Sequence, residues 1–448
     1  MRRFAVVGAG PGGLVAAKEL LAAGAEPVVF ERAAEIGGVW REGGLAWPGM
    51  STNLSKHSCC FSDFPWPHDA PDFPSRDDMR GYLHRYAERF GLTAHLRLGE
   101  TVTTVSGSVV NGERFDGVVF ASGAFGPNGT EYHGPERYRG KRVVVVGAAF
   151  SGAEIAAELA ANGVEVTAVA SRPMWLLPRY LDGVPWDLVS YRRGRPKLSW
   201  VEANRRFSRI AVNPGEFDER LRVDPDSDGP PYLVISDLVP DVLRAGALRM
   251  EPGRAVRREP GAVVLDTGVR LPCDAVIECT GHRLELPYLS QDQRAALGHD
   301  PADLVQPLLL HECTFHPEFQ DAAFVGLYRG PYFGVVELQA RWAAAVLTGA
   351  LPAPTGMDAG LLRQREIREL RPRPQFPHGD YVGMADRLAA ELGVLPDPVP
   401  DGPLVPAHYR LCGPGAAPDV AAAEIASVAR RTAGSFPMTS PRRRGDGW

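Results

Sequence analysis

Two glycine-rich motifs, 139 residues apart, constrain the fold of this chain more than any other feature. The first, FAVVGAGPGG at 4–13, places Gly8, Gly10 and Gly13 in a G-x-G-x-x-G frame. The second, RVVVVGAAFSG at 142–152, keeps two of the three glycines. Each motif follows a short apolar run and precedes a helical stretch, which is the order of a strand–turn–helix dinucleotide-binding unit. Two such units predict two dinucleotides brought face to face.

The fold class expected from this pattern is α/β, with two Rossmann-like dinucleotide-binding domains and the second inserted in the first. Apolar runs of the kind found in buried parallel strands recur at 117–123 and 274–281, as related halves would require. The expected boundaries are 1–140 and 285–433 for the first domain and 141–284 for the second, with a disordered tail at 434–448. Residues 41–77 and 172–231 are rich in Pro and aromatic residues and are expected to be irregular.

Composition excludes several classes of partner. A formal charge of −5 over 448 residues, with no basic stripe, argues against nucleic acid. No apolar run approaches the roughly 20 residues that cross a bilayer, so a cytoplasmic protein without a membrane partner is expected. None of the six cysteines forms a C-x-x-C pair, which excludes zinc knuckles and the dithiol flavoprotein reductases.

The first motif has the residues of an adenine dinucleotide site. Gly8 permits the tight turn after the strand, Gly10 lets a pyrophosphate approach, and Gly13 lets the helix pack close to the sheet. Pro11 and Gly12 complete the same turn. Glu31, 23 residues after Gly8, is placed to accept ribose hydroxyl groups and would repel a 2′-phosphate, so FAD or NAD fits and NADP does not.

The second motif has no such acid. Its expected strand, 164–170, leads instead to Arg172, whose guanidinium suits a 2′-phosphate and favours NADPH over NADH. Gly147, Ser151 and Gly152 would hold the rest of this dinucleotide. Ala149 replaces the middle glycine, and its methyl group would push the pyrophosphate outward. The alternative is a vestigial unit that binds nothing tightly.

Several further segments occur in order between and after the motifs. Together with GAGPGGL they resemble the class B flavoprotein monooxygenases, the flavin-containing monooxygenase family, along nearly the whole chain. The segments are ERAAEIGGVW at 31–40, STNLSKHSCCFSDFPWP at 51–67, ASGAFGPN at 121–128, SRPMWLLPR at 171–179, PYLVISDLV at 231–239, CTGHR at 279–283, ELQARW at 337–342 and YRLCGPG at 409–415.

The resemblance implies the cofactors FAD, in the first domain, and NADPH, in the second. In that family NADPH reduces the flavin, and molecular oxygen then forms a 4a-hydroperoxyflavin that bound NADP+ shields. A nucleophilic nitrogen or sulfur of a small substrate takes one oxygen atom, and the other leaves as water. The cofactor performs the chemistry, and the protein positions it and excludes water.

The same resemblance assigns residues to the two sites. Val39, Trp40 and Val102 would lie along FAD. Thr52 and Asn53 would lie close to the isoalloxazine, with Asn53 as the catalytic residue, because an amide donates and accepts at once. Taken alone, an Asx turn would explain that asparagine. Gln339 would approach the flavin or close the domain interface.

Two residues near these segments have plainer interpretations. Lys56 is expected to be a solvated surface charge, and Trp175 is expected to belong to the core.

The expected function is oxygenation of the nitrogen of a small amine, giving a hydroxylamine or an oxime, with sulfur second. Baeyer–Villiger relatives carry an F-x-G-x-x-x-H-S linker, whereas EYHGPERYRGK at 131–141 has no His-Ser pair. A Baeyer–Villiger enzyme is the first alternative, and an NADPH oxidase that releases hydrogen peroxide is another. Membrane-bound relatives end in a hydrophobic anchor, whereas PRRRGDGW predicts a soluble chain. The sequence does not decide whether the chain forms a homodimer.

Overall fold

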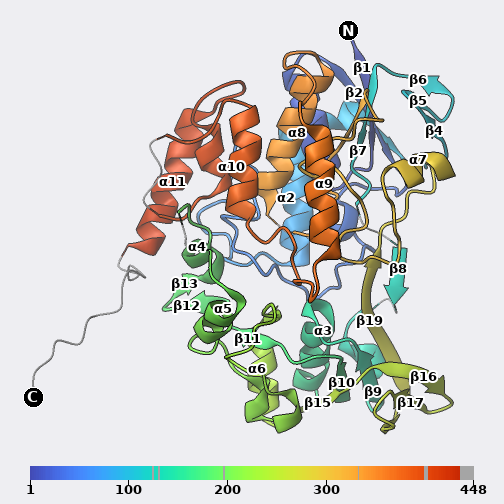
Figure 1. The fold of residues 1–448 in the computed structure, drawn as a ribbon, viewed down its shortest axis with the longest axis vertical. Coiled ribbons are helices and arrows are strands. Elements are labelled where there is room, and N and C mark those ends of the chain that lie inside the picture. The colour runs from blue at the N-terminus through green and yellow to red at the C-terminus, as the bar shows by residue number, and fades with distance from the viewer. Residues whose placement is uncertain (124–125, 130–131, 195–196, 331, 398–401, 434–448) are drawn as a thin grey trace, which may run out of the picture.

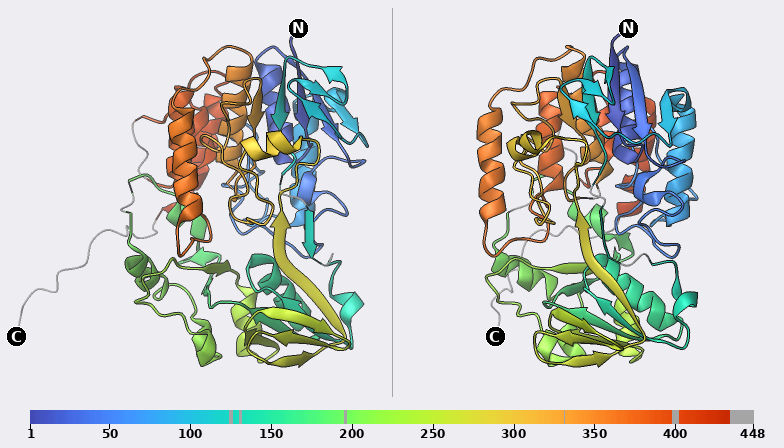
Figure 2. Two further views of the ribbon diagram at one scale, coloured as in Figure 1. Left: turned by 45° about the vertical axis from the view of Figure 1, so that its right-hand side comes forward. Right: turned by 90° about the vertical axis from the view of Figure 1, so that its right-hand side faces the viewer.

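A computed structural model describes residues 1–123, 126–129, 132–194, 197–330, 332–397 and 402–433. The expected tail at 434–448 lies outside these residues. The described chain forms two α/β bodies, one above the other in Figure 1, with the long strand β19 running from the lower body toward the upper one. Figure 2 shows the same two bodies from the side.

The upper body is built on a parallel sheet with the strand order β20-β7-β1-β2-β3. Its strands are β1 (Arg3–Val7), β2 (Glu26–Glu31), β3 (Leu96–Leu98), β7 (Gly117–Phe120) and β20 (Ala322–Phe324). Four of these strands precede the second glycine motif and one follows it by about 170 residues of chain, counted along the sequence. The chain therefore leaves this sheet and returns to it.

The lower body has a sheet with the order β15-β10-β9-β19-β8, parallel except for the last pair. Its strands are β8 (Gly126–Gly129), β9 (Arg142–Val146), β10 (Glu165–Ala170), β15 (Leu248–Pro252) and β19 (Ala275–Arg283). The α/β class with one Rossmann-like unit inserted in another is thus confirmed. Strand β8 already belongs to the lower sheet although it precedes residue 140.

Helices cover the sheets and connect the bodies. They are α1 (Pro11–Ala22), α2 (Arg76–Arg89), α3 (Phe150–Ala161), α4 (Trp186–Ser190), α5 (Trp200–Phe207), α6 (Leu238–Arg244), α7 (Gln291–Ala296), α8 (Phe333–Leu347), α9 (Met357–Glu369), α10 (Tyr381–Glu391) and α11 (Pro418–Thr432). No helix in the described ranges has the length and apolar character that crossing a bilayer demands.

Short strands and 3₁₀ turns complete the fold. The strands are β4 (Val105–Ser106), β5 (Val109–Val110), β6 (Glu113–Arg114), β11 (Trp175–Leu177), β12 (Tyr180–Leu181), β13 (Val184–Pro185), β14 (Leu233–Ile235), β16 (Ala255–Glu259), β17 (Ala262–Leu265) and β18 (Arg270–Pro272). The turns are η1 (Gly38–Trp40), η2 (Leu92–His95), η3 (Pro135–Tyr138), η4 (Pro214–Glu216), η5 (Glu219–Leu221) and η6 (Pro406–Arg410).

The two stretches expected to be irregular differ. Residues 41–75 contain turns and two isolated bridges, Ser51 to Ser75 and Phe61 to Phe64, with no helix or longer strand, as predicted. The prediction for 172–231 is wrong, because this stretch forms β11, β12, β13, α4 and α5. Capping explains one of these elements: the Ser199 hydroxyl accepts from the Glu202 N–H, and the Glu202 carboxylate reaches back to the Ser199 N–H, which starts α5.

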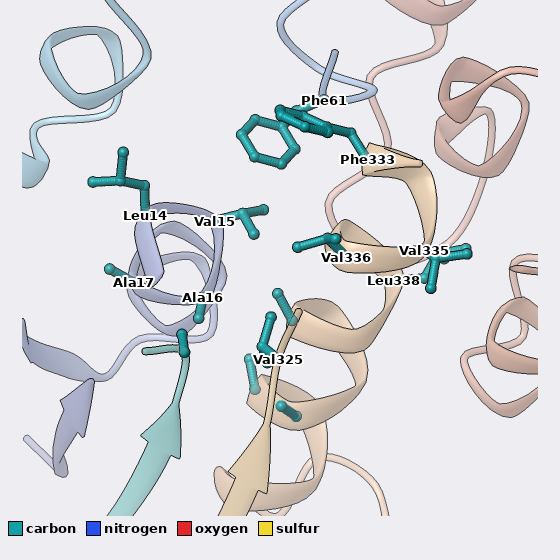
Figure 3. Packing of buried hydrophobic residues seen from close by; sticks show 14 of the residues in the cluster. Leu14, Val15, Ala16, Ala17, Phe61, Val325, Phe333, Val335, Val336 and Leu338 are labelled. Carbon is teal, nitrogen blue, oxygen red and sulfur yellow. The ribbon is translucent and has the colours of Figure 1, made fainter. Parts of the chain in front are cut away.

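The largest apolar cluster lies between α1 and α8 in the upper body, and Figure 3 shows its centre. Val15 of α1 faces Val336 of α8, and the Phe61 and Phe333 rings lie 5.1 Å apart. Phe61 comes from the irregular segment. That segment is therefore part of the core and not a surface loop.

A buried charge cluster lies beside this core. Arg410 is fully buried, and its guanidinium donates to Glu19 at 2.7 Å and contacts Asp63 at 3.3 Å and Glu337. Lys18 pairs with Glu19 at 2.9 Å and with Asp63. Burial pushes the pKa of Glu19 upward, but Arg410 and Lys18 together hold it below its ordinary value. Burial and the neighbouring Glu337 raise the pKa of Asp63.

We predict that Arg410→Leu destabilises the protein strongly, because it leaves three buried carboxylates with one lysine. Breaking a buried pair typically costs about 3–5 kcal/mol, which for a chain of 448 residues corresponds to a fall of roughly 3–5 °C in the midpoint of thermal unfolding. The unpaired carboxyl groups would then have raised pKa values in the folded state, so part of the loss returns as the pH falls. Arg431→Leu is the control, since it removes an exposed pair with Asp72. Equal midpoints for the two variants would contradict the assignment.

Candidate functional site

The first glycine turn is built as the motif predicts. Gly8 has φ +103°, and a Cβ there would lie 2.7 Å from the Ala121 carbonyl oxygen. A Cβ on Gly13 would lie 1.8 Å from the Gly8 carbonyl oxygen, so the helix can approach the strand only through glycine. Pro11 opens α1, where a missing N–H costs nothing, and Gly12 packs against the Val325 carbonyl.

The middle glycine meets the segment that follows β2. Gly10 caps α1, and a Cβ on Gly38 would lie 3.0 Å from the Gly10 Cα. The Gly37 N–H donates to the Ala9 carbonyl at 2.9 Å. The half-buried Val39 and Trp40 follow in η1 and so lie beside the N-terminus of α1, whose first N–H groups have no partner within the helix.

Glu31 ends β2 inside this turn. Its two carboxylate oxygens accept the Ala9 N–H at 2.8 Å and the Ala33 N–H at 2.9 Å. The carboxylate is 8% exposed, and each oxygen retains a second lone pair. Two backbone donors therefore fix its orientation while acceptor capacity remains for ribose hydroxyl groups.

The second turn repeats the first closely. Gly147 has φ +96°, and its Cβ would lie 2.4 Å from the Cys279 carbonyl oxygen. A Cβ on Gly152 would lie 1.7 Å from the Gly147 carbonyl oxygen. Ala149 caps α3 with φ −73° and ψ −168°, against −76° and −174° for Gly10. Alanine therefore adopts the backbone of the middle glycine, and only its methyl group is added to the turn.

Arg172 lies just beyond β10 at the surface. Its guanidinium stacks on the Tyr232 ring at 4.3 Å, and no carboxylate of the described residues pairs with it. The Tyr232 hydroxyl donates to the Arg373 carbonyl at 2.7 Å. The Gln375 side chain accepts from the Leu233 N–H at 2.8 Å and donates to the Leu233 carbonyl at 3.0 Å. A loop of the upper body thus supports the stacking partner of Arg172, which no sequence motif indicated.

The same loop reaches the start of α3. The Phe376 ring contacts the Phe150 ring at 5.7 Å, and the Arg329 guanidinium lies 5.5 Å above Phe376. Both bodies therefore contribute to the surroundings of the second glycine turn.

Asn53 and Ser151 line one hollow between the two bodies, called the interdomain hollow below. Its lining consists of Trp47, Met50, Ser51, Asn53, Phe150, Ser151 and Glu154. The first four residues come from the irregular segment and the last three from the first turns of α3. The Asn53 amide has no hydrogen-bond partner among the described residues, so the Asx turn is not formed there. The amide is free to donate and to accept.

Two carboxyl groups of α3 face this segment. Burial raises the pKa of Glu154, against a hydrogen bond from Ser236 and the charge of Arg179. Burial also raises the pKa of Glu158, which meets Trp47 and whose carboxylate lies against Gly49. Both shifts are in the direction that favours the neutral form. The sequence motifs did not indicate these acids, although their spacing of four places them on one helix face.

The remaining predicted residues lie around the first turn. Thr52 is 3% exposed, and its hydroxyl has no hydrogen-bond partner within the described ranges, which leaves an orphaned polar atom beside Asn53. Val102 packs in the apolar cluster that contains Phe30. Gln339 is fully buried: its amide accepts from the Gly326 N–H at 3.0 Å and donates to the Cys313 carbonyl at 2.9 Å. It supports the turn beside Gly12 and does not line the interdomain hollow.

Two side-chain interpretations can be decided. Lys56 is not a solvated surface charge: it is 8% exposed and donates to the carbonyls of His68 at 2.8 Å and Ala70 at 2.6 Å. Trp175 belongs to the core, as expected, and its indole N–H donates to the Asn204 side chain at 3.0 Å.

Comparison with known proteins agrees with this geometry. The sequence profile of the flavin-binding monooxygenase-like family matches residues 1–111 and 108–435. The chain belongs to this family. Dimethylaniline monooxygenase [N-oxide-forming] 2 of Rattus norvegicus is 30% identical over 93% of this chain and 89% of its own. Flavin-containing monooxygenase 2 of Homo sapiens is 29% identical over 92% and 89%.

Solved structures of other flavin monooxygenases share the fold. S-allyl-L-cysteine S-oxygenase from Allium sativum superimposes with a TM-score of 0.59 at 20% identity, over 88% of each chain. Cyclohexanone-bound cyclohexanone monooxygenase gives 0.64 at 16% identity, over 87% of this chain and 97% of its own. FAD and NADPH are the cofactors of this flavin monooxygenase family, in agreement with the cofactors predicted from the sequence.

The residues present fit both groups. The first turn offers a cradle in which Gly8 and Gly13 leave no room for a Cβ, with Glu31 oriented beside it and the orphaned Thr52 hydroxyl further along. The second turn has the same backbone, and the Arg172 guanidinium beyond it has no carboxylate partner in the described part of the chain.

We predict that Arg172→Ala weakens NADPH selectively. Hydrogen bonds to charged groups contribute about 1.5–3 kcal/mol, so KM for NADPH should rise roughly 10- to 100-fold, whereas KM for NADH should change little. Steady-state kinetics with both dinucleotides measure this. Arg205→Ala is the control, because that exposed arginine pairs with Asp226 on the same body. Equal changes for the two dinucleotides would remove the basis for a 2′-phosphate contact at Arg172.

Proposed function

We propose that this protein is an NADPH- and oxygen-dependent flavin monooxygenase that oxygenates the nitrogen of a small amine. The observation that carries the proposal is the meeting of Asn53 and Ser151 in the interdomain hollow, where a flavin held by the first turn and a nicotinamide held by the second would converge. In the net reaction NADPH and the amine are oxidised, and one oxygen atom enters the amine while the other leaves as water.

The chain's own groups position and shield the reacting centre. FAD and NADPH supply the electrons and the activation of oxygen. Glu31 holds a ribose, Arg172 holds a 2′-phosphate, and the Asn53 amide offers a donor and an acceptor beside the orphaned Thr52 hydroxyl. Trp47, Met50 and Phe150 give the interdomain hollow an apolar wall. Such a wall favours the neutral amine, which alone carries the lone pair that reacts.

Two observations favour nitrogen over a ketone. The Baeyer–Villiger linker motif is missing from 131–141. The similar rat enzyme bears a name that describes N-oxide formation. The structural likeness to cyclohexanone monooxygenase, at 16% identity, supports the fold alone. Sulfur is the second candidate, since a thioether presents a comparable lone pair and an S-oxygenase shares the fold.

The experiment that tests the substrate class uses a tertiary amine, a thioether and a cyclic ketone of similar size. Each is incubated with NADPH and isotopically labelled dioxygen, and products are analysed by mass spectrometry. We expect one labelled oxygen atom per amine and the highest kcat/KM for the amine. A higher kcat/KM for the ketone would overturn the assignment, and stoichiometric peroxide with all three would indicate an oxidase. The glycine-like backbone of Ala149 argues against that last outcome.

We predict that Asn53→Ala retains flavin reduction by NADPH but uncouples it from oxygenation. Loss of hydrogen bonds to a charged or strongly polar group should lower product per NADPH about tenfold or more, and peroxide should rise to match. Anaerobic reduction kinetics and a peroxide assay separate the two steps. Asn162→Ala, at the other end of α3, is the control. Unchanged coupling in Asn53→Ala would return Asn53 to a structural role.

A further inference from the structure

A buried carboxylate on α4 forms hydrogen bonds with the segment that carries Asn53. Asp187 is fully buried and accepts three hydrogen bonds: from the Ser55 N–H at 3.1 Å, the Ser55 hydroxyl at 2.7 Å and the Ser58 hydroxyl at 2.6 Å. The two serines lie more than 125 residues away in the sequence. A single side chain therefore joins two distant parts of the chain.

The donors match a carboxylate. Three N–H or O–H groups point at Asp187, and an ionised carboxylate is the side chain that only accepts. No lysine or arginine of the described residues pairs with it. Burial raises its pKa, and the hydrogen bonds from Ser58 and Ser55 oppose that shift. A buried acid without a cation is costly, and an apolar side chain would fill the space at lower cost.

The rest of the segment is tied to its own C-terminal end, just before α2. The Thr52 N–H donates to the Pro74 carbonyl at 2.9 Å, and the Lys56 N–H donates to the Asp72 carbonyl at 2.7 Å. Asp187 holds the stretch between and after these points from the other side. Because both the N–H and the hydroxyl of Ser55 bind one carboxylate, the position and the direction of the backbone at residue 55 are set.

Helix α4 is itself anchored on both sides. It follows the β12–β13 hairpin of the inserted region, and Leu188 packs with Val405, Ala421 and Val428 of the C-terminal elements. Figure 1 shows α4 just below α10 and α11. The Leu404 N–H donates to the Tyr191 carbonyl at 2.7 Å, directly after the helix. A displacement of α4 would therefore reach Asn53, two residues before Ser55.

We propose that Asp187 is a positioning residue, which sets the location of the Asn53 amide in the interdomain hollow through Ser55 and Ser58. This inference rests on the proposed function, because it assigns to Asp187 the placement of a group that acts in coupling. Asp187 does not itself line the interdomain hollow. Its effect must therefore pass through the segment.

The test compares Asp187→Asn, Asn53→Ala and the double variant as FAD-loaded enzymes. Asp187→Asn keeps the size but turns one acceptor into a donor. We expect flavin reduction by NADPH to stay within about threefold while product per NADPH falls roughly tenfold. In the Asn53→Ala background the same change should lower product per NADPH by less than about twofold, since it acts through Asn53. Peptides that cover 51–60 should exchange amide hydrogen faster in Asp187→Asn.

Glu251→Gln is the matched control. Glu251, on β15, is 1% exposed and pairs with Arg220 of η5 and with Arg249, away from the Asn53 segment. It should leave product per NADPH and exchange at 51–60 unchanged. Ser58→Ala removes one donor without a change of charge and should give an intermediate loss of coupling. It supplies the same comparison if Asp187→Asn does not fold.

Two results would overturn the proposal: full coupling in both Asp187→Asn and Ser58→Ala, or equal losses from Asp187→Asn with and without Asn53. Failure of the proposed function has a different signature, because the unaltered enzyme would then either prefer the ketone or release stoichiometric peroxide with every substrate. Hydrogen exchange at 51–60 would still report whether Asp187 holds the segment.

Discussion

The charge of Arg410, buried among three carboxylates, is the interaction on which the rest of the upper body depends. It joins α1 through Glu19, the irregular segment through Asp63 and α8 through Glu337. No strand pairing joins these three elements in the described chain. The ion cluster therefore fixes the position of α1, the helix of the first glycine turn, relative to the segment that carries Asn53. Apolar packing alone would specify this relative position less sharply.

Ala149 illustrates how little a motif consensus says about geometry. The two glycines that the second turn needs, Gly147 and Gly152, are those where a Cβ would meet a backbone oxygen at 2.4 and 1.7 Å. The middle position has extended backbone dihedrals that alanine adopts freely. The substitution therefore changes only the surface that faces a phosphate, and the proposed weakness of this site becomes a question of one methyl group.

The sequence predicted those parts of the fold in which local rules dominate. The glycine turns, their strands and α1 and α3 follow from short-range sterics and apolar patterning, and Glu31 follows from its spacing after Gly8. Three features were not predicted. They are the hydrogen bonds between Asp187 and Ser55, the support of Tyr232 by the loop at 373–376, and the carboxyl groups of Glu154 and Glu158. Each depends on tertiary contacts between distant segments, for which a single sequence carries no signal. The prediction that Lys56 is a solvated surface charge was wrong for the same reason, since its carbonyl partners lie in a loop without regular hydrogen bonding.

The support of Tyr232 has a consequence for the modularity of the two nucleotide folds. Arg172 belongs to the inserted body, but the ring on which it stacks is held by the Arg373 carbonyl, and Gln375 completes the edge of β14 beside it. A recombinant chimaera that exchanged residues 141–284 alone would carry Arg172 and Tyr232, but not the loop at 373–376 that supports the Tyr232 ring. With Arg172 as the proposed 2′-phosphate contact, the preference for one dinucleotide would be a joint property of both bodies, open to change through the loop at 373–376 as well as through the inserted body.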